Sequence, residues 1–128
     1  MTLGMAEMLL GGITSFVDMY FEEDHCVGVV EKMGMRAVLG CSYFDATIDK
    51  TLASAERAVK AADGKERIRI SVAPHAPYTV SEENLVRGKR FAEEHGLDYM
   101  VHAAETQDEL KYVAEKYGTT PVRLLDRF

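Results

Sequence analysis

Four times along this chain, a short apolar run is followed by a helical pattern that stops on a glycine. The runs are ITSFVDMYF, MRAVLGCSYF, IRISVAP and DYMVHAAE, and the helical patterns after them close on Gly34, Gly64, Gly96 and Gly118. Apolar runs of this length favour strands, and glycine supplies the left-handed residue that ends a helix. Strands that alternate with helices pair in parallel through right-handed crossovers. The sequence therefore predicts an α/β protein.

Two parallel architectures fit this pattern, a small open doubly wound sheet and part of a (β/α)8 barrel. Four units suit the first, because a complete barrel needs about 250 residues and the chain has 128. The two ends favour the second. MTLGMAEMLLGG has the pattern of a helix with no strand before it, and Thr120 with Pro121 starts a helix that stops within two turns. We therefore predict a partial (β/α)8 TIM barrel, with four parallel strands alternating with helices, and one domain over residues 1–128.

A complete flavodoxin-like domain is a third possibility. It would carry a phosphate-binding glycine loop or an acidic cluster at the end of the first strand. The stretch ITSFVDMYFEED has acidic residues but no such loop, so we rank this architecture last.

The charge balance and the apolar segments exclude several classes of protein. Fifteen basic and twenty-one acidic residues give a net charge of −6, without a basic stripe, which argues against a nucleic-acid partner. The longest apolar stretch is interrupted by Glu7 and two glycines, so it is a poor membrane span. The amino terminus does not have the pattern of a signal peptide, and we expect a cytoplasmic protein. Cys26 and Cys41 show no CxxC spacing, which indicates neither a disulfide framework nor a thiolate zinc site.

Reactive side chains follow the predicted strands, where parallel α/β folds build their sites. They are Asp18 and Tyr20, then Ser42 and Asp45, then His75, and finally His102 and Glu105. A histidine at the last inward position of an apolar strand is unexpected unless the protein uses it. Because the carboxyl ends of parallel strands share one edge, His75 and His102 could face one site.

The chemistry of these residue types suggests a metal centre. Neutral imidazole is a common zinc ligand, and a carboxylate beside a metal can transfer protons. His102 with Glu105 offers both roles, and His75 in PHAPYTVS lies on a loop stiffened by Pro74 and Pro77. The residues alone leave His102 open between a metal ligand and a structural histidine.

Other polar residues are typical of helix ends. Thr106 with Glu109 forms a T-x-x-E capping box, and Ser81 precedes two glutamates at a helix start. His25 lies in an acidic run at another helix start, and His95 directly precedes a terminating glycine. We assign His25 and His95 no function.

The motifs VAPHAPYTVSEENL and, further along, VHAAET resemble the amidohydrolase superfamily. Within it the chain most resembles the branch of methylthioadenosine/S-adenosylhomocysteine deaminases and chlorohydrolase-like enzymes. AEMLLGGITSFVDMYF is similar to the second-strand segment of these enzymes. The resemblance implies that the chain is a central fragment covering about strands two to five of an eight-stranded barrel.

The resemblance also implies roles for three residues. His102 matches the metal-binding histidine at the end of the fifth strand, Glu105 the glutamate that handles protons, and His75 the H-x-P-Y histidine that lines the substrate pocket. The implied cofactor is a divalent metal, with zinc as the first expectation. It would activate a water that attacks a ring carbon of a cyclic amidine, such as an adenine-type nucleoside, and ammonia would leave.

The chain departs from the family pattern in two respects. The family needs an H-x-H pair, a histidine on the sixth strand and an aspartate on the eighth, but the only histidines here are His25, His75, His95 and His102. We therefore expect the metal site to be incomplete and the isolated chain to be inactive. In addition, AVLGCSYFDATIDK has no arginine after its strand, where adenosine-type enzymes of this branch hold the ribose or a carboxylate.

A rival prediction is a non-catalytic α/β module that binds a small molecule or a partner chain at the same rim. Four strands of a barrel leave two sheet edges unpaired, which favours pairing with another chain. For either function we expect a small-molecule ligand and self-association through these edges.

Overall fold

The computed structural model describes residues 1–128 and contains one four-stranded parallel sheet with the order β1-β2-β3-β4. The strands are β1 (Ser15–Tyr20), β2 (Arg36–Tyr43), β3 (Ile68–Pro74) and β4 (Asp98–Tyr99). Each strand lies beside the next one in the sequence, without the reversal of order that defines a doubly wound sheet. The predicted α/β class is confirmed, and this order is that of a barrel segment.

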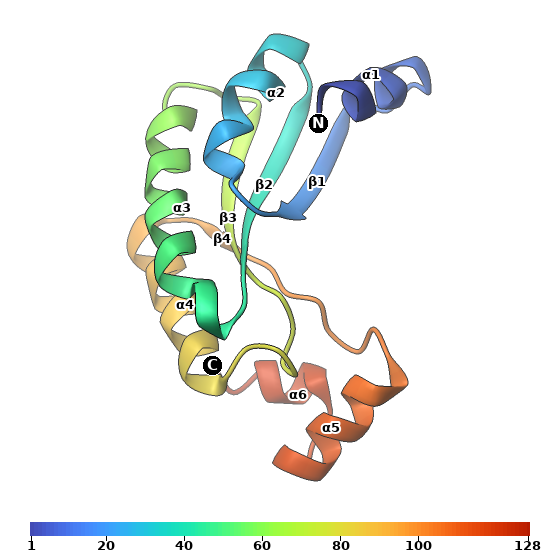
Figure 1. Cartoon of the computed structure of the whole chain (residues 1–128), viewed down its shortest axis with the longest axis vertical. Coiled ribbons are helices and arrows are strands. Elements are labelled where there is room, and N and C mark those ends of the chain that lie inside the picture. Colours follow the sequence, from blue (N-terminus) through green and yellow to red (C-terminus); the bar gives the residue numbers. More distant parts are fainter.

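Three helices cover one face of the sheet, as Figure 1 shows. They are α2 (Val27–Met33), α3 (Ile48–Ala62) and α4 (Glu82–His95). Helix α1 (Thr2–Leu10) precedes the first strand, whereas α5 (Gln107–Tyr117) and α6 (Pro121–Leu125) lie beyond the carboxyl ends of the strands. Crossovers of one hand between sequential neighbours place every connecting helix on the same side, as in a barrel wall. No helix in the structure is both long enough and apolar enough to cross a membrane.

The helix ends follow the predicted signals. Gly34, Gly96 and Gly118 end α2, α4 and α5 with φ values of 73°, 63° and 64°. The hydroxyls of Ser81 and Thr106 accept hydrogen bonds from backbone N–H groups at the starts of α4 and α5. These signals work from sequence because each depends only on contacts within one helical turn.

The fourth strand is shorter than predicted. DYMVHAAE contributes only Asp98 and Tyr99 to regular strand structure. Two more hydrogen bonds join this segment to the β3 segment, each 3.0 Å long. Met100 N donates to Val72 O in the register of the two strands, whereas His102 N donates to His75 O, one residue out of that register. Ala104 then takes a left-handed φ of 57°, so the chain leaves the sheet.

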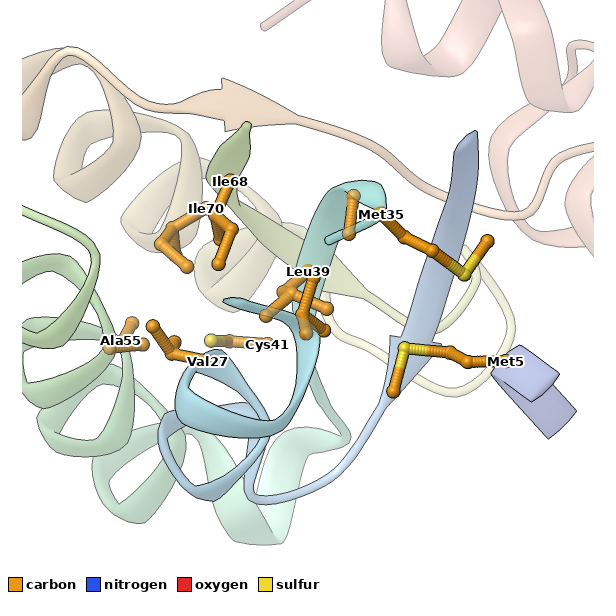
Figure 2. Packing of buried hydrophobic residues seen from close by; sticks show 11 residues of the cluster. Met5, Val27, Met35, Leu39, Cys41, Ala55, Ile68 and Ile70 are labelled. Carbon is orange, nitrogen blue, oxygen red and sulfur yellow. The ribbon is translucent and has the colours of Figure 1, made fainter. Parts of the chain in front are cut away.

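The main core lies between the sheet and its helices. Figure 2 shows eight labelled members of its cluster of buried residues, which come from α1, α2, α3, β2, β3 and the residue before β2; they are Met5, Val27, Met35, Leu39, Cys41, Ala55, Ile68 and Ile70. A second cluster surrounds Tyr43, whose hydroxyl donates a hydrogen bond to the Asn84 carbonyl at 2.9 Å. Both cysteines are free. Alternate residues of β2 and β3 thus anchor the helices, and the residues between them face the opposite side.

Gly40 marks a close approach on that opposite face. A Cβ atom at this position would lie 2.8 Å from the Asp18 carbonyl oxygen and would collide with the Met100 side chain. The backbone oxygen cannot move without disturbing the pairing of β1 with β2.

We expect Gly40→Ala to lower the free energy of unfolding by about 1–3 kcal/mol, as overpacking does in other cores. Gly28→Ala is the matched control, because no atom lies within 4 Å of its added Cβ and alanine favours helices by up to about 1 kcal/mol. Urea unfolding of both variants measures the difference. Equal stability of the two would contradict the packing described for Gly40.

Glu23 is a charged side chain inside the fold. It lies in the 3-10 turn Glu23–His25 after β1, is 1% exposed, and neither carboxylate oxygen has a hydrogen-bond partner. Burial, together with the nearby carboxylate of Asp18, raises the pKa of Glu23 to about 7. Below about pH 7, the folded protein therefore favours the protonated, neutral side chain of Glu23.

This burial predicts a pH-dependent stability. Between the ordinary pKa of 4.5 and about 7, folded Glu23 holds a proton that the unfolded chain releases. The stability contributed by that proton is lost as pH rises through this range. Glu23→Gln cannot ionise, so at pH 8 it should exceed the wild type in unfolding free energy by up to about 3 kcal/mol, and by much less at pH 4.5.

Denaturant unfolding from pH 4.5 to 8 measures this effect. The exposed neighbour Glu22 provides the control Glu22→Gln, which should follow the wild-type profile. Parallel pH profiles for the wild type and Glu23→Gln would show that Glu23 ionises normally in the folded protein.

Candidate functional site

His75 and His102 meet at the carboxyl edge of the sheet. Their ring centroids are 5.4 Å apart and their planes cross at 82°. His75 directly follows β3, and the hydrogen bond from His102 N to His75 O holds the two backbones together. The His102 ring is exposed and the His75 ring is half-buried. Two imidazoles thus share one open rim.

Thr79 orients the His75 ring. Its hydroxyl lies 2.8 Å from His75 Nδ1 and donates its proton to the Ala76 carbonyl at 3.2 Å. Thr79 Oγ1 thus lies within hydrogen-bond distance of both His75 Nδ1 and the Ala76 carbonyl, and this contact orients the ring. Burial, and then the nearby His102, lower the pKa of His75. Both effects favour the neutral ring, and Nε2 has no hydrogen-bond partner within the chain.

Glu105 lies on the same loop as His102, three residues further along, and its side chain is exposed. The loop is held by Glu109, whose carboxylate accepts hydrogen bonds from Ala104 N at 3.0 Å and Glu105 N at 2.8 Å. The predicted capping box is half correct. Thr106 Oγ1 accepts from Glu109 N at 3.1 Å, but the Glu109 carboxylate reaches past Thr106 to the two preceding amides. The site loop and the helix start are thereby joined.

Asp45 holds a neighbouring part of the rim. One of its carboxylate oxygens accepts hydrogen bonds from Ser81 N, Ser81 Oγ and Asn84 Nδ2, at 2.8, 2.9 and 2.8 Å. Burial opposes ionisation of this carboxyl, but the hydrogen bonds from Asn84 and Ser81 outweigh it and lower its pKa. Asp45 therefore joins the turn after β2 to the start of α4, a structural role at the predicted rim.

Three other predicted rim residues do not join the two histidines. Asp18 pairs in register with the buried Leu39 and faces Glu23 on the helix side of the sheet. Ser42 is 4% exposed, and its carbonyl accepts a hydrogen bond from Thr51. Tyr20 is 65% exposed at the end of β1. Alternation along a strand reverses the direction of each successive side chain, which turns Asp18 away from the site, while burial closes off Ser42.

A row of aromatic rings leads to His75. The sequence analysis named Tyr20 but missed Phe21 and Phe44. Ring centroids are 5.0 Å apart for Tyr20 and Phe21, 6.1 Å for Phe21 and Phe44, and 4.7 Å for Phe44 and His75. Tyr78 adds an edge contact to His75 at 5.8 Å. A signal for the row was present, because Phe21 and Phe44 each directly follow a strand. These tilted rings offer an apolar surface beside His75.

The donor set fits part of a metal site. The exposed His102 ring forms no hydrogen bond with another residue, so a ring nitrogen is available as a ligand. The structure contains no group of three histidine, cysteine, aspartate or glutamate residues that could hold a metal ion. His102 can therefore contribute one ligand, and a complete coordination shell needs donors in addition to those of residues 1–128.

The relatives found by comparison with known proteins are named as deaminases. The chain is 38% identical over 130 residues to the 5'-deoxyadenosine deaminase of Methanothermobacter thermautotrophicus, a match that covers 97% of this chain and 30% of that protein. It is 35% identical over 130 residues to the 5-methylthioadenosine/S-adenosylhomocysteine deaminase of Aquifex aeolicus, with the same coverage. The chain thus spans about 30% of the length of these relatives. Their names agree with the predicted branch.

Solved structures agree with the fold. A zinc-bound adenosine deaminase from Xanthomonas campestris superposes with a TM-score of 0.91 and 32% identity, over 98% of this chain and 30% of that one. A zinc complex of atrazine chlorohydrolase from Arthrobacter aurescens gives a TM-score of 0.83 at 18% identity, over 98% and 33%. The second likeness concerns the fold alone. These neighbours confirm the prediction of a partial barrel.

The sequence profile of the amidohydrolase family matches residues 1–128. Because this match includes both histidine motifs of the rim and every strand of the sheet, the chain belongs to the amidohydrolase family.

Proposed function

We propose that residues 1–128 form one domain segment, about strands two to five, of a barrel that hydrolyses a carbon–nitrogen bond of a cyclic amidine. The proposed substrate is a small molecule such as an adenine-type nucleoside, and the proposed reaction is deamination. One observation carries the proposal: the rings of His75 and His102 lie 5.4 Å apart at the carboxyl edge of a parallel sheet, with Glu105 on the same loop as His102. Relatives named as deaminases support the reaction class.

The proposed activity belongs to a whole enzyme. The chain spans about 30% of its relatives, and it holds no group of three residues that could bind a metal. We therefore propose that the isolated chain is inactive.

His102 is the proposed metal ligand within this chain. The proposed ion is a divalent metal, and zinc is favoured by the bound zinc of the Xanthomonas campestris structure. When bound, such an ion polarises the substrate and lowers the pKa of a water, which makes that water a nucleophile near neutral pH. The half-buried His75, by contrast, already uses Nδ1 to bind Thr79.

Glu105 and His75 are proposed to act on the substrate. Glu105 would take the two protons of the attacking water in turn, giving one to a ring nitrogen and the other to the amine, which leaves as ammonia. Thr79 binds Nδ1 of His75, so Nε2 is free and would form a hydrogen bond with the substrate. The aromatic row beside it would stack against a flat heterocycle.

Two substitutions in the full-length protein test these roles. His102→Ala should abolish metal-dependent turnover and reduce bound metal, because a ligand is lost. Glu105→Gln should retain metal but lower kcat by about 10²–10⁴-fold, the usual contribution of a general acid–base group. Steady-state deamination of adenine-type nucleosides, together with metal analysis, measures both effects. The exposed His25 provides the control His25→Ala, which should behave as the wild type. Activity of His102→Ala at normal metal content would overturn the proposal.

The isolated chain is expected to self-associate. β1 and β4 each pair on one side only, and Val17 on β1 is 63% exposed. Open strand edges pair readily with other strands. Sedimentation of the 128-residue chain across the micromolar range should therefore show dimers or larger species. A single monomeric species throughout that range would contradict this expectation.

A further inference from the structure

Glu109 is buried in a way that its helix alone does not require. It lies on the first turn of α5 and is 0% exposed. Oε1 accepts from Ala104 N at 3.0 Å and Oε2 from Glu105 N at 2.8 Å. Both oxygens are thus directed at two successive amides of the loop that follows His102. Hydrogen bonds of amides to an ionised carboxylate are stronger than those between neutral groups.

Helix capping does not account for this contact. Thr106 Oγ1 already caps the helix by accepting from Glu109 N. In an ordinary capping box the glutamate returns to the amide of the capping residue, which here is Thr106. The Glu109 carboxylate instead binds the amides one and two residues before Thr106. Its bonds therefore stabilise the loop in addition to the helix.

The loop needs such a partner because its backbone is strained. Ala104 has a φ of 57°, a left-handed conformation that is unfavourable for a residue with a Cβ atom. Strained residues persist where surrounding contacts hold them. The two bonds to Glu109 act on Ala104 itself and on the next residue. They hold the turn at Ala104, which lies between His102 and Glu105 and takes the chain away from the direction of the strand.

We propose that Glu109 is a positioning residue that sets the place of Glu105 relative to His102. The inference rests on the proposed proton-transfer role of Glu105. Glu109 does not itself need to contact the substrate, because it acts through the backbone of Ala104 and Glu105. A displacement of about 1 Å at a reacting group can lower a rate by about 10²-fold, so a change in this turn is sufficient to affect turnover.

Glu109→Gln in the full-length protein tests the proposal. The amide keeps the shape but places an NH2 group against one of the two N–H donors, so one hydrogen bond is lost. We expect kcat to fall by about 10- to 100-fold, with KM and metal content close to the wild type. Adding Ala104→Gly should restore part of the lost kcat, because glycine accepts a positive φ without strain. Thr106→Ala is the control, because it removes the helix cap but leaves the Glu109 bonds to the loop.

Amide hydrogen exchange at single-residue resolution gives a readout that does not depend on activity. In the wild type, the amides of Ala104 and Glu105 should exchange slowly, while that of Thr106 exchanges fast. In Glu109→Gln, the first two should lose protection while the interior of α5 keeps it. The wild-type measurement tests the proposal even if the variant fails to fold.

The outcomes separate the two proposals. Full activity of Glu105→Gln would overturn the proposed role of Glu105, while hydrogen exchange would still test the Glu109 bonds. If Glu105→Gln is inactive but Glu109→Gln keeps wild-type kcat, the positioning role is wrong. Fast exchange of Ala104 and Glu105 in the wild type would overturn it as well, as would equal losses of kcat in Thr106→Ala and Glu109→Gln.

Discussion

The hydrogen bond from the His102 backbone N–H to the His75 carbonyl, 3.0 Å long, joins the two chain segments just beyond the parallel pairing of β3 and β4. Parallel pairing brings the carboxyl ends of neighbouring strands to one edge, and this last bond fixes the two imidazoles side by side there. The rest of the structure depends on the same ladder. Along β2 and β3, alternate side chains pack against the helices on one face of the sheet. The side chains between them lie on the other face, which leads to the rim. A shift of one residue in the register would exchange these two sets of side chains.

The rim is stabilised differently from the core. The core is a layer of apolar side chains between the sheet and α2, α3 and α4. At the rim, short polar contacts hold each loop: Asp45 binds the start of α4, Thr79 binds His75, and Glu109 binds the two amides beside Glu105. Carboxylates suit this task because their oxygens accept several hydrogen bonds each. Such contacts allow His102 and Glu105 to remain exposed to a substrate while their backbones are ordered.

Several details of the structure could not be predicted from the sequence. The length of β4 was overestimated, because the apolar pattern could not reveal that the chain leaves the sheet and turns at Ala104. Asp18 and Ser42 both lie near strand ends, but alternation directs Asp18 to the helix side of the sheet, and Ser42 is buried. The capping box predicted the Thr106 bond correctly but not the destination of the Glu109 carboxylate, which depends on the left-handed turn at Ala104. The aromatic row at Phe21 and Phe44 was missed because aromatic residues after strands are common in cores.

The sequence by itself determined the α/β class, the helix ends at Gly34, Gly96 and Gly118, the caps at Ser81 and Thr106, and the motifs that mark the family. These features follow from hydrophobic periodicity and from contacts within a single turn, so neighbouring residues are sufficient to specify them. Only the tertiary structure decided that His75 and His102 lie 5.4 Å apart, that Thr79 orients one of them, and that Glu109 holds the loop of Glu105. The contact between the histidines joins residues far apart in the chain. Those of Thr79 and Glu109 depend on the direction in which a loop leaves its strand, and that direction is set by the pairing and packing of the whole sheet.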